Sequence, residues 1–198
     1  MSYSPSPPPP LSRATLVIGL YGAMGIAAFL LAAGRGDPDL YRLGGSPAGW
    51  QLASAPAFGV VLGLVVVGLT RIATRRFQWA RDLHVSFRDL LGPLVVREIV
   101  ILALASSIGE ELLFRGALLP WFGLWAQAGI FALLHVGPGR RFLPWTASAL
   151  GLGLAFGALA SWTGNLGGPI AAHFTINFLN LRYIVAAPLR DDDDRERT

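Results

Sequence analysis

Three separate apolar stretches of this chain carry small clusters of side chains that could do chemistry. Carboxylates and imidazoles can take a proton from water, and imidazole and amide N–H groups can donate to a developing oxyanion. Ionisable groups surrounded by hydrocarbon are costly, so their presence there predicts a functional site. In chain order the candidate residues are Glu110, Glu111 and Arg115, then Phe131 and His135, then His173 and Asn177.

The two adjacent glutamates are expected to do different work. Glu111 and Arg115 are an i,i+4 pair with the acid first, which is the favoured orientation of an ion pair on a helix. Glu110 projects about 100° away around the helix, so it faces elsewhere. We therefore predict that Glu111 and Arg115 form a structural ion pair and that Glu110 is the free carboxylate.

Helix geometry predicts that Glu110 meets His135. Pro120 and Gly123 indicate a turn between the first two stretches. Glu110 lies 13 residues before Gly123, and His135 lies 12 residues after it. In an antiparallel pair of helices that rise ~1.5 Å per residue, both side chains lie roughly 18–20 Å from the turn. A carboxylate beside an imidazole can activate a water molecule as a nucleophile.

His173 and Asn177 are also an i,i+4 pair, so they project from one helix face. Their N–H groups could stabilise an oxyanion. Taken alone, such a pair is more typical of hydrogen bonds that hold membrane helices together. Three polar clusters in one otherwise uncharged bundle instead favour a common site.

The composition is typical of a membrane protein. Hydrophobic residues make up 53% of the 198 positions and charged residues only 14%, whereas globular proteins have about 25% charged residues. The absence of cysteine excludes disulfides and thiolate metal sites. The net charge of +4 comes entirely from arginine, and in a membrane protein it indicates orientation and not nucleic-acid binding. We predict an all-α, polytopic bundle of transmembrane helices.

Six spans are expected, at about 15–33, 50–69, 94–119, 121–136, 142–162 and 167–187. Residues 70–93 have the largest basic excess, which favours the cytoplasmic side and an interfacial helix. Both termini are then cytoplasmic. The Pro-rich residues 1–14 and the charged residues 190–198 are predicted to be disordered tails of a membrane domain at 15–189.

Two further features concern packing and topology. Gly59-x-x-x-Gly63 predicts a close approach between two helices.

His173 shortly follows the loop at 163–168, whereas His135 precedes the turn that begins at Gly137. Simple spanning helices would place the two histidines toward opposite faces, so we expect a broken or re-entrant element around 137–145.

The motifs Glu-Glu-x-x-x-Arg, Phe-x-x-x-His and His-x-x-x-Asn, in this order, resemble those of the CPBP family of intramembrane endopeptidases. This is the CAAX-prenyl-protease-2-like or ABI family. The resemblance covers about residues 94–185 and implies a glutamic peptidase that needs no cofactor. It implies that Glu110 and His135 activate the water and that His173 and Asn177 stabilise the oxyanion, with Phe131 as a supporting motif residue.

These observations predict an integral protease of the bacterial inner membrane. Its substrate would be a membrane-associated protein or peptide, cut near its C terminus or membrane segment, as in CAAX-protease-like processing or the removal of a C-terminal sorting tail. Its partners would be this substrate and the lipid bilayer, with no nucleic acid, and the sequence assigns no oligomeric state.

Three alternatives remain open at this point. The first is a zinc metalloprotease with Glu110, His135 and His173 as ligands, although no His-Glu-x-x-His helix is present. The second is a non-catalytic bacteriocin-immunity or partner-binding protein of the same fold. The third is a small transporter whose glutamate and histidines relay protons.

Overall fold

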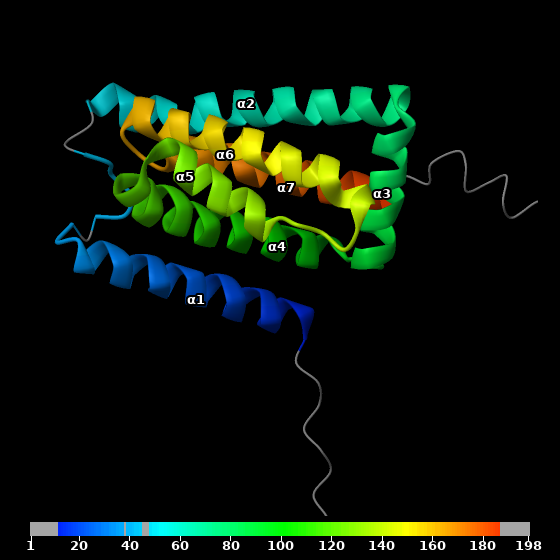
Figure 1. Ribbon diagram of the computed structural model, residues 1–198, viewed down its shortest axis with the longest axis horizontal. Coiled ribbons are helices and arrows are strands. Elements are labelled where there is room, and N and C mark those ends of the chain that lie inside the picture. Colours follow the sequence, from blue (N-terminus) through cyan, green and yellow to red (C-terminus); the bar gives the residue numbers. More distant parts are fainter. Residues whose placement is uncertain (1–11, 38, 45–47, 187–198) are drawn as a thin grey trace, which may run out of the picture.

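The computed structural model describes residues 12–37, 39–44 and 48–186 as helices joined by short loops (Figure 1). Within these ranges no β-strand forms, and an isolated bridge joins Arg42 to Asn165. The all-α prediction is therefore confirmed. The elements are α1 (Arg13–Gly34), α2 (Gly49–Arg76), α3 (Gln78–Leu91), α4 (Val96–Glu111), the π-helix η1 (Leu112–Leu118), α5 (Leu119–Leu134), the short 3-10 helix η2 (Arg140–Phe142), α6 (Leu143–Thr163) and α7 (Gly167–Ala186).

Four segments are long and apolar enough to cross a membrane, namely residues 13–34, 49–76, 96–134 and 140–163. The third contains two of the predicted spans, α4 with η1 and then α5. It is interrupted at Gly123, where φ is 77°, so the turn predicted near this glycine is confirmed.

The sixth predicted span, α7, is not among these four segments, although it is 20 residues long. It carries the polar residues His173, Asn177, Asn180 and Arg182, which lower its hydropathy. A polar helix is tolerated here because α7 lies inside the bundle and packs against α2, α4 and α6.

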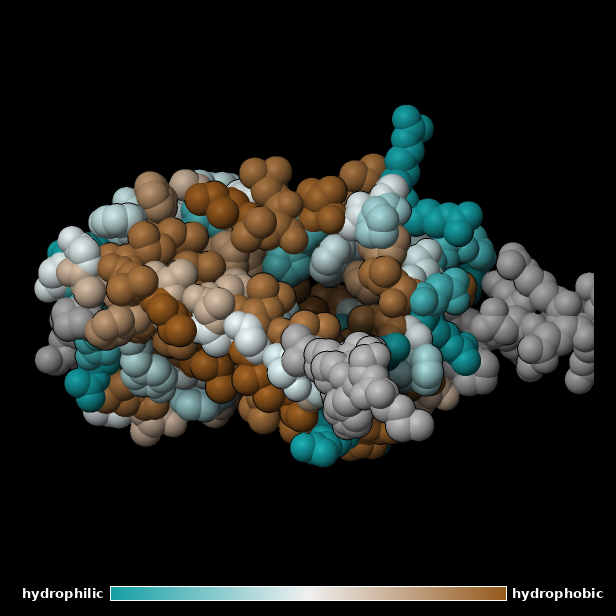
Figure 2. All heavy atoms as spheres, turned by 90° about the horizontal axis from the view of Figure 1, so that it is seen from below, coloured by the Kyte–Doolittle hydropathy of each residue, from teal (hydrophilic) through white to brown (hydrophobic). Residues whose placement is uncertain are grey.

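The outer surface is apolar, as a lipid-facing surface must be. Large apolar side chains on α1 and α2 are more than half exposed, among them Leu16, Ile26, Leu30, Val61 and Leu69. Figure 2 shows a broad hydrophobic surface, with hydrophilic residues mainly toward its two ends. This distribution matches a bilayer with hydrocarbon in the middle and water on both sides.

Helix α3 crosses one end of the bundle, where the sequence predicts an interfacial helix (Figure 1). The Arg13 side chain ties the start of α1 to this end, because it donates hydrogen bonds to the carbonyl oxygens of Leu91 and Pro93 at 3.1 and 3.0 Å. Helix α7 also contacts α3 and, in Figure 1, ends beside it. The first and last described helices therefore have their outer ends on the same side.

Helix α1 begins two residues before the predicted domain boundary at 15. The Ser12 side chain accepts a hydrogen bond from the Thr15 backbone N–H at 3.2 Å, and this N-cap starts the helix at Arg13. The remainder of the two predicted tails, residues 1–11 and 190–198, lies outside the described residues.

The predicted close approach at Gly59 and Gly63 is confirmed, and it joins α2 to α7. A Cβ atom on Gly59 would meet the backbone of Gly168. A Cβ atom on Gly63 would lie 2.8 Å from the Thr175 Cβ and 3.0 Å from the Ala172 carbonyl oxygen. These two glycines therefore allow α2 to pack closely against α7, the polar helix inside the bundle.

The substitution Gly63→Ala is expected to destabilise the protein by roughly 1–3 kcal/mol, because the added methyl overpacks this contact. Gly68→Ala on the same helix is the matched control, since a Cβ there meets nothing within 4 Å. Thermal unfolding in detergent measures both variants. Equal melting temperatures for the two would contradict the packing described here.

Candidate active site

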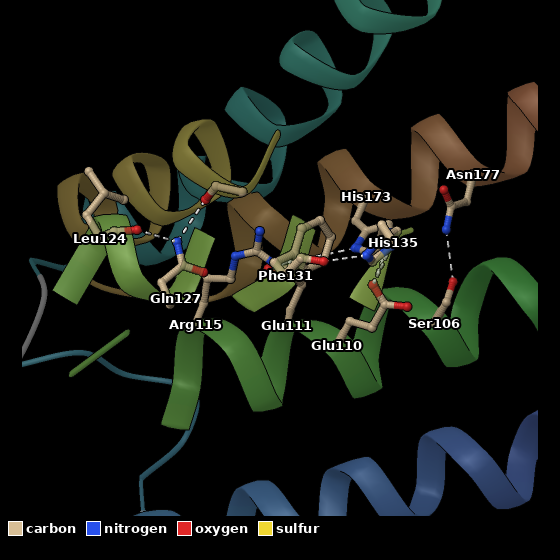
Figure 3. A network of polar contacts seen from close by, with 11 residues as sticks. Ser106, Glu110, Glu111, Arg115, Leu124, Gln127, Phe131, His135, His173 and Asn177 are labelled. Carbon is tan, nitrogen blue, oxygen red and sulfur yellow. Dashed lines mark hydrogen bonds and ion pairs between the residues drawn. The ribbon is translucent and has the colours of Figure 1, made fainter. Parts of the chain in front are cut away.

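Glu110 and Glu111 are the last residues of α4, directly before the backbone widens into η1. Figure 3 shows both side chains directed from α4 toward the histidines of α5 and α7. π-Helices are rare and frequently occur at functional sites. The helical register therefore changes immediately after the two carboxylates.

Arg115 lies in η1 and is fully buried. Its guanidinium donates a hydrogen bond from Nη1 to Glu111 Oε1 at 2.9 Å, as the i,i+4 spacing predicts. The guanidinium carbon also lies 4.5 Å from the ring centre of Phe131, 5.2 Å from that of Phe156 and 5.8 Å from that of Phe114. Cation–π contacts with three rings add to the ion pair in stabilising the buried charge.

His173 comes from α7 and joins the same carboxylate. Its Nδ1 lies 2.8 Å from Glu111 Oε1, and its Nε2 lies 3.8 Å from Glu110 Oε2. Because an ionised carboxylate only accepts hydrogen bonds, Nδ1 carries the proton in this contact. Glu111 thus has two partners, Arg115 and His173, where the sequence predicts Arg115 alone.

His135 is the C-cap residue of α5. Its Nδ1 lies 2.7 Å from the Phe131 carbonyl oxygen, which can only accept, so Nδ1 is the donor. The imidazole also packs against the Phe131 ring, tilted by 33° with centroids 4.2 Å apart, and the Trp145 ring lies 5.2 Å away in an edge orientation. These contacts fix the ring with Nε2 directed at Glu110.

Glu110 is where the two histidines converge (Figure 3). Its Oε2 lies 3.7 Å from His135 Nε2 and 3.8 Å from His173 Nε2. Both distances are too long for direct hydrogen bonds. Among the described residues this buried oxygen has no hydrogen-bond partner. The meeting of Glu110 with His135, predicted from equal depths, is thus found in the structure.

Asn177 faces α4 one turn beyond His173, as the shared helix face predicts. Its Nδ2 donates a hydrogen bond to Ser106 Oγ at 2.9 Å. Ser106 in turn donates to the Ala103 carbonyl oxygen at 3.3 Å. One N–H of the amide is therefore engaged with α4.

The break expected around 137–145 is found between α5 and α6. Helix α5 stops at Leu134, residues 136–139 are non-helical, and η2 leads into α6 at Leu143. Because α5 ends this early, His135 meets Glu110 from one side while His173 reaches it from α7. The end of the expected interval, 143–145, belongs to the regular helix α6.

Two polar residues near the site, Ser106 and Gln127, could have been identified from their positions in the sequence. Ser106 lies one turn before Glu110 on α4. Gln127 is a polar residue within the apolar α5, and it is fully buried, with Nε2 donating to the Gly153 carbonyl oxygen on α6 at 2.9 Å. Ser106 is a polar residue at helical spacing from the Glu110 motif, and Gln127 is a single polar residue in an apolar span. Either pattern could have identified the residue from the sequence.

Two other neighbours could not have been identified in this way. Phe156 on α6 lies over Arg115, and its ring centre is 5.6 Å from that of His173. Tyr21 on α1 lies beside Gly109, the residue before Glu110, since a Cβ atom on Gly109 would lie 2.9 Å from the Tyr21 Cβ. Both are ordinary residues of apolar helices, so only the packing of those helices brings them here.

The zinc alternative requires Glu110, His135 and His173 to act as ligands. In the part of the chain that the structure describes, no group of three or more His, Cys, Asp or Glu residues has an arrangement suited to a metal ion. The hydrogen bonds at the two Nδ1 atoms would suit zinc-bound and metal-free imidazoles alike, so the metal content has to be measured.

The fold and site together define a helical membrane protein whose polar centre brings together two glutamates, an arginine and two histidines, with Asn177 one turn away on α7. Residues 92–179 match the family model described as type II CAAX prenyl endopeptidase Rce1-like. This range includes every candidate residue from Glu110 to Asn177. The resemblance inferred from the motifs is therefore confirmed over this segment.

A curated relative is the uncharacterized protein YpbD of Bacillus subtilis (strain 168). It is 38% identical over 84 residues, which make up 41% of this chain and 43% of that protein. The chain therefore spans less than half the length of this relative. No solved structure matches the chain.

The substitution Glu111→Gln is expected to destabilise the protein by roughly 3–5 kcal/mol, because it leaves the buried Arg115 without its counter-charge. Glu98→Gln is the matched control on the same helix, since Glu98 accepts a hydrogen bond from the Val95 backbone N–H at the exposed start of α4. Glu98→Gln is expected to lower the free energy of unfolding by about 1 kcal/mol or less. The measurement is thermal unfolding in detergent, and similar losses at both positions would show that the buried pair is not a major stabilising contact.

Proposed function

We propose that this chain is an intramembrane endopeptidase that hydrolyses a peptide bond near the C terminus or membrane segment of a protein substrate. The observation that carries the proposal is the convergence of His135 and His173 on the unpartnered Oε2 of Glu110. The match of residues 92–179 to a CAAX endopeptidase family supports the same activity.

Glu110 and His135 would activate the water. The Phe131 carbonyl holds the proton of His135 on Nδ1, so in the neutral ring Nε2 is an acceptor facing a carboxylate oxygen, which is also an acceptor. One water molecule can donate a hydrogen bond to each of them. Its oxygen lone pair then attacks the substrate carbonyl carbon, while Glu110 takes the proton and later transfers it to the leaving amine as the C–N bond breaks.

His173 and Asn177 would stabilise the oxyanion that forms in this step. An oxyanion donor at His173 needs a proton on Nε2, the ring nitrogen that lies 3.8 Å from Glu110 Oε2. Asn177 has a second N–H besides the one donated to Ser106. In this proposal Glu111 and Arg115 orient His173 and do not touch the substrate.

The proposed substrates are membrane-associated proteins, processed as in CAAX-protease-like cleavage or the trimming of C-terminal sorting tails. The proposed location is the bacterial inner membrane with both termini in the cytoplasm. The basic last turn of α2, with Arg75 and Arg76, lies with α3 and the outer ends of α1 and α7 at one end of the bundle, and positive charge marks the cytoplasmic side.

The substitution Glu110→Gln is expected to abolish cleavage without unfolding the protein, because the amide keeps the shape of the side chain but cannot take a proton. The measurement is mass spectrometry of membrane proteins from cells that carry the wild type, Glu110→Gln or the control Glu98→Gln. Truncated membrane proteins are expected with the wild type and the control only. Persistent cleavage by Glu110→Gln would overturn its role as base, and no cleavage by the wild type would favour the non-catalytic binding protein.

Metal removal is expected to leave activity intact, because the proposed water needs only Glu110 and His135. Purified protein is dialysed against a chelator, and its zinc content and cleavage rate are then measured. Zinc present at one equivalent, lost together with activity and restored with it, would instead identify the metalloprotease with Glu110, His135 and His173 as ligands.

A further inference from the structure

His135 lies at the junction between α5 and the break before α6, so its own helix holds it on one side only. Its backbone N–H donates to the Ala132 carbonyl oxygen at 3.0 Å, where α5 ends. The backbone hydrogen bonds of the segment that follows join Gly139 to Gly137 and Phe142 to Gly139. Among the described residues no backbone N–H donates to the His135 carbonyl oxygen. A carbonyl at the end of a helix needs a partner from outside that helix.

Thr146, in the first turn of α6, provides this partner. Its hydroxyl donates a hydrogen bond to the His135 carbonyl oxygen at 2.8 Å, whereas the Phe142 carbonyl oxygen lies 3.4 Å away. A hydroxyl has one proton to donate, and 2.8 Å is the usual length of an O–H···O bond, so the proton goes to His135. Threonine hydroxyls inside helices commonly bond to a carbonyl one turn earlier, as Thr70 does to Val66. Thr146 instead bonds across the break.

The residue before Thr146 contacts the imidazole itself. The Trp145 ring lies edge-on to the His135 ring, with centroids 5.2 Å apart. Trp145 is in turn packed edge-on against Phe87 of α3, with centroids 5.1 Å apart. Two consecutive residues of α6 therefore hold His135, Thr146 at its backbone carbonyl and Trp145 at its ring.

We propose that Thr146 is a positioning residue, whose hydroxyl holds the backbone of His135 so that its Nε2 stays 3.7 Å from Glu110 Oε2. These are the two atoms that the proposed water has to contact together. A displacement of a reacting group by ~1 Å can lower a rate about 10²-fold. As far as catalysis is concerned, the inference rests on the proposed peptidase function. The hydrogen bond from Thr146 to His135 does not.

Thr146→Val tests the catalytic part, because it removes the hydroxyl and keeps the branched shape of the side chain. We expect kcat to fall about ten- to a hundredfold, while KM stays within about twofold. Thr146→Ser restores the hydroxyl and is expected to retain most of the wild-type kcat. Thr70→Val is the matched control, since the Thr70 hydroxyl bonds within its own helix. Unchanged kcat in Thr146→Val, an equal loss in Thr70→Val, or a serine variant as slow as the valine variant would overturn the proposal.

Acylation of the histidines by diethyl pyrocarbonate tests the contact without any activity. Mass spectrometry of the peptides gives separate rates for His84, His135 and His173 in the folded protein. Thr146→Val is expected to raise the rate at His135 about two- to tenfold, because loss of one hydrogen bond raises the population in which this turn is open. His173, whose Nδ1 is bound to Glu111, is expected to react at the wild-type rate.

An unchanged rate at His135, or equal increases at all three histidines, would overturn the inference. A selective increase at His135, in a protein whose wild type shows no cleavage, would retain the contact and refute the proposed function alone.

Discussion

The buried charge of Arg115 is the constraint on which the rest of the site depends. A guanidinium cannot lie in a hydrocarbon bundle without compensation, and here one carboxylate oxygen of Glu111 and three phenylalanine rings provide it. The rings come from η1, α5 and α6, and His173 of α7 binds the same carboxylate oxygen. One charged group therefore fixes the relative positions of every helix that contributes a candidate catalytic residue.

The two neighbouring glutamates differ because of their angular offset on α4. Glu111 faces Arg115 and His173 and has a donor from each, so its charge is already compensated. Glu110 faces the space between the two Nε2 atoms, and its Oε2 has no partner among the described residues. Glu110 Oε2 can therefore accept a hydrogen bond from a water molecule beside the two imidazoles, whereas Glu111 Oε1 already accepts one from Arg115 and one from His173. This asymmetry supports the proposed assignment of Glu111 to structure and of Glu110 to chemistry.

Local periodicity predicted much of this arrangement but not its details. Counting 13 and 12 residues from Gly123 placed Glu110 opposite His135, and i,i+4 spacing placed Arg115 on Glu111 and Asn177 beside His173. These predictions depend only on helix rise and turn. The bond from His173 to Glu111, the contact of Asn177 with Ser106 and the approach of Tyr21 depend on how separate helices rotate against each other. The spacing of residues within a single helix does not determine that rotation. The residues of the π-helix after Glu111 also show no pattern that distinguishes them from an α-helix.

The early end of α5 also leaves non-helical backbone beside a pocket at one end of the bundle. Backbone groups of residues 136–139 lack helical hydrogen bonds, and such backbone is tolerated in a membrane protein where it lines a polar cavity. A pocket of about 680 Å³ lies between this segment and α3, lined among others by Asp89, Arg140 and Phe142. The Phe142 ring contacts that of Trp145, which in turn contacts His135. The break that lets His135 reach Glu110 thus also borders this pocket, at the end of the bundle where α3 lies.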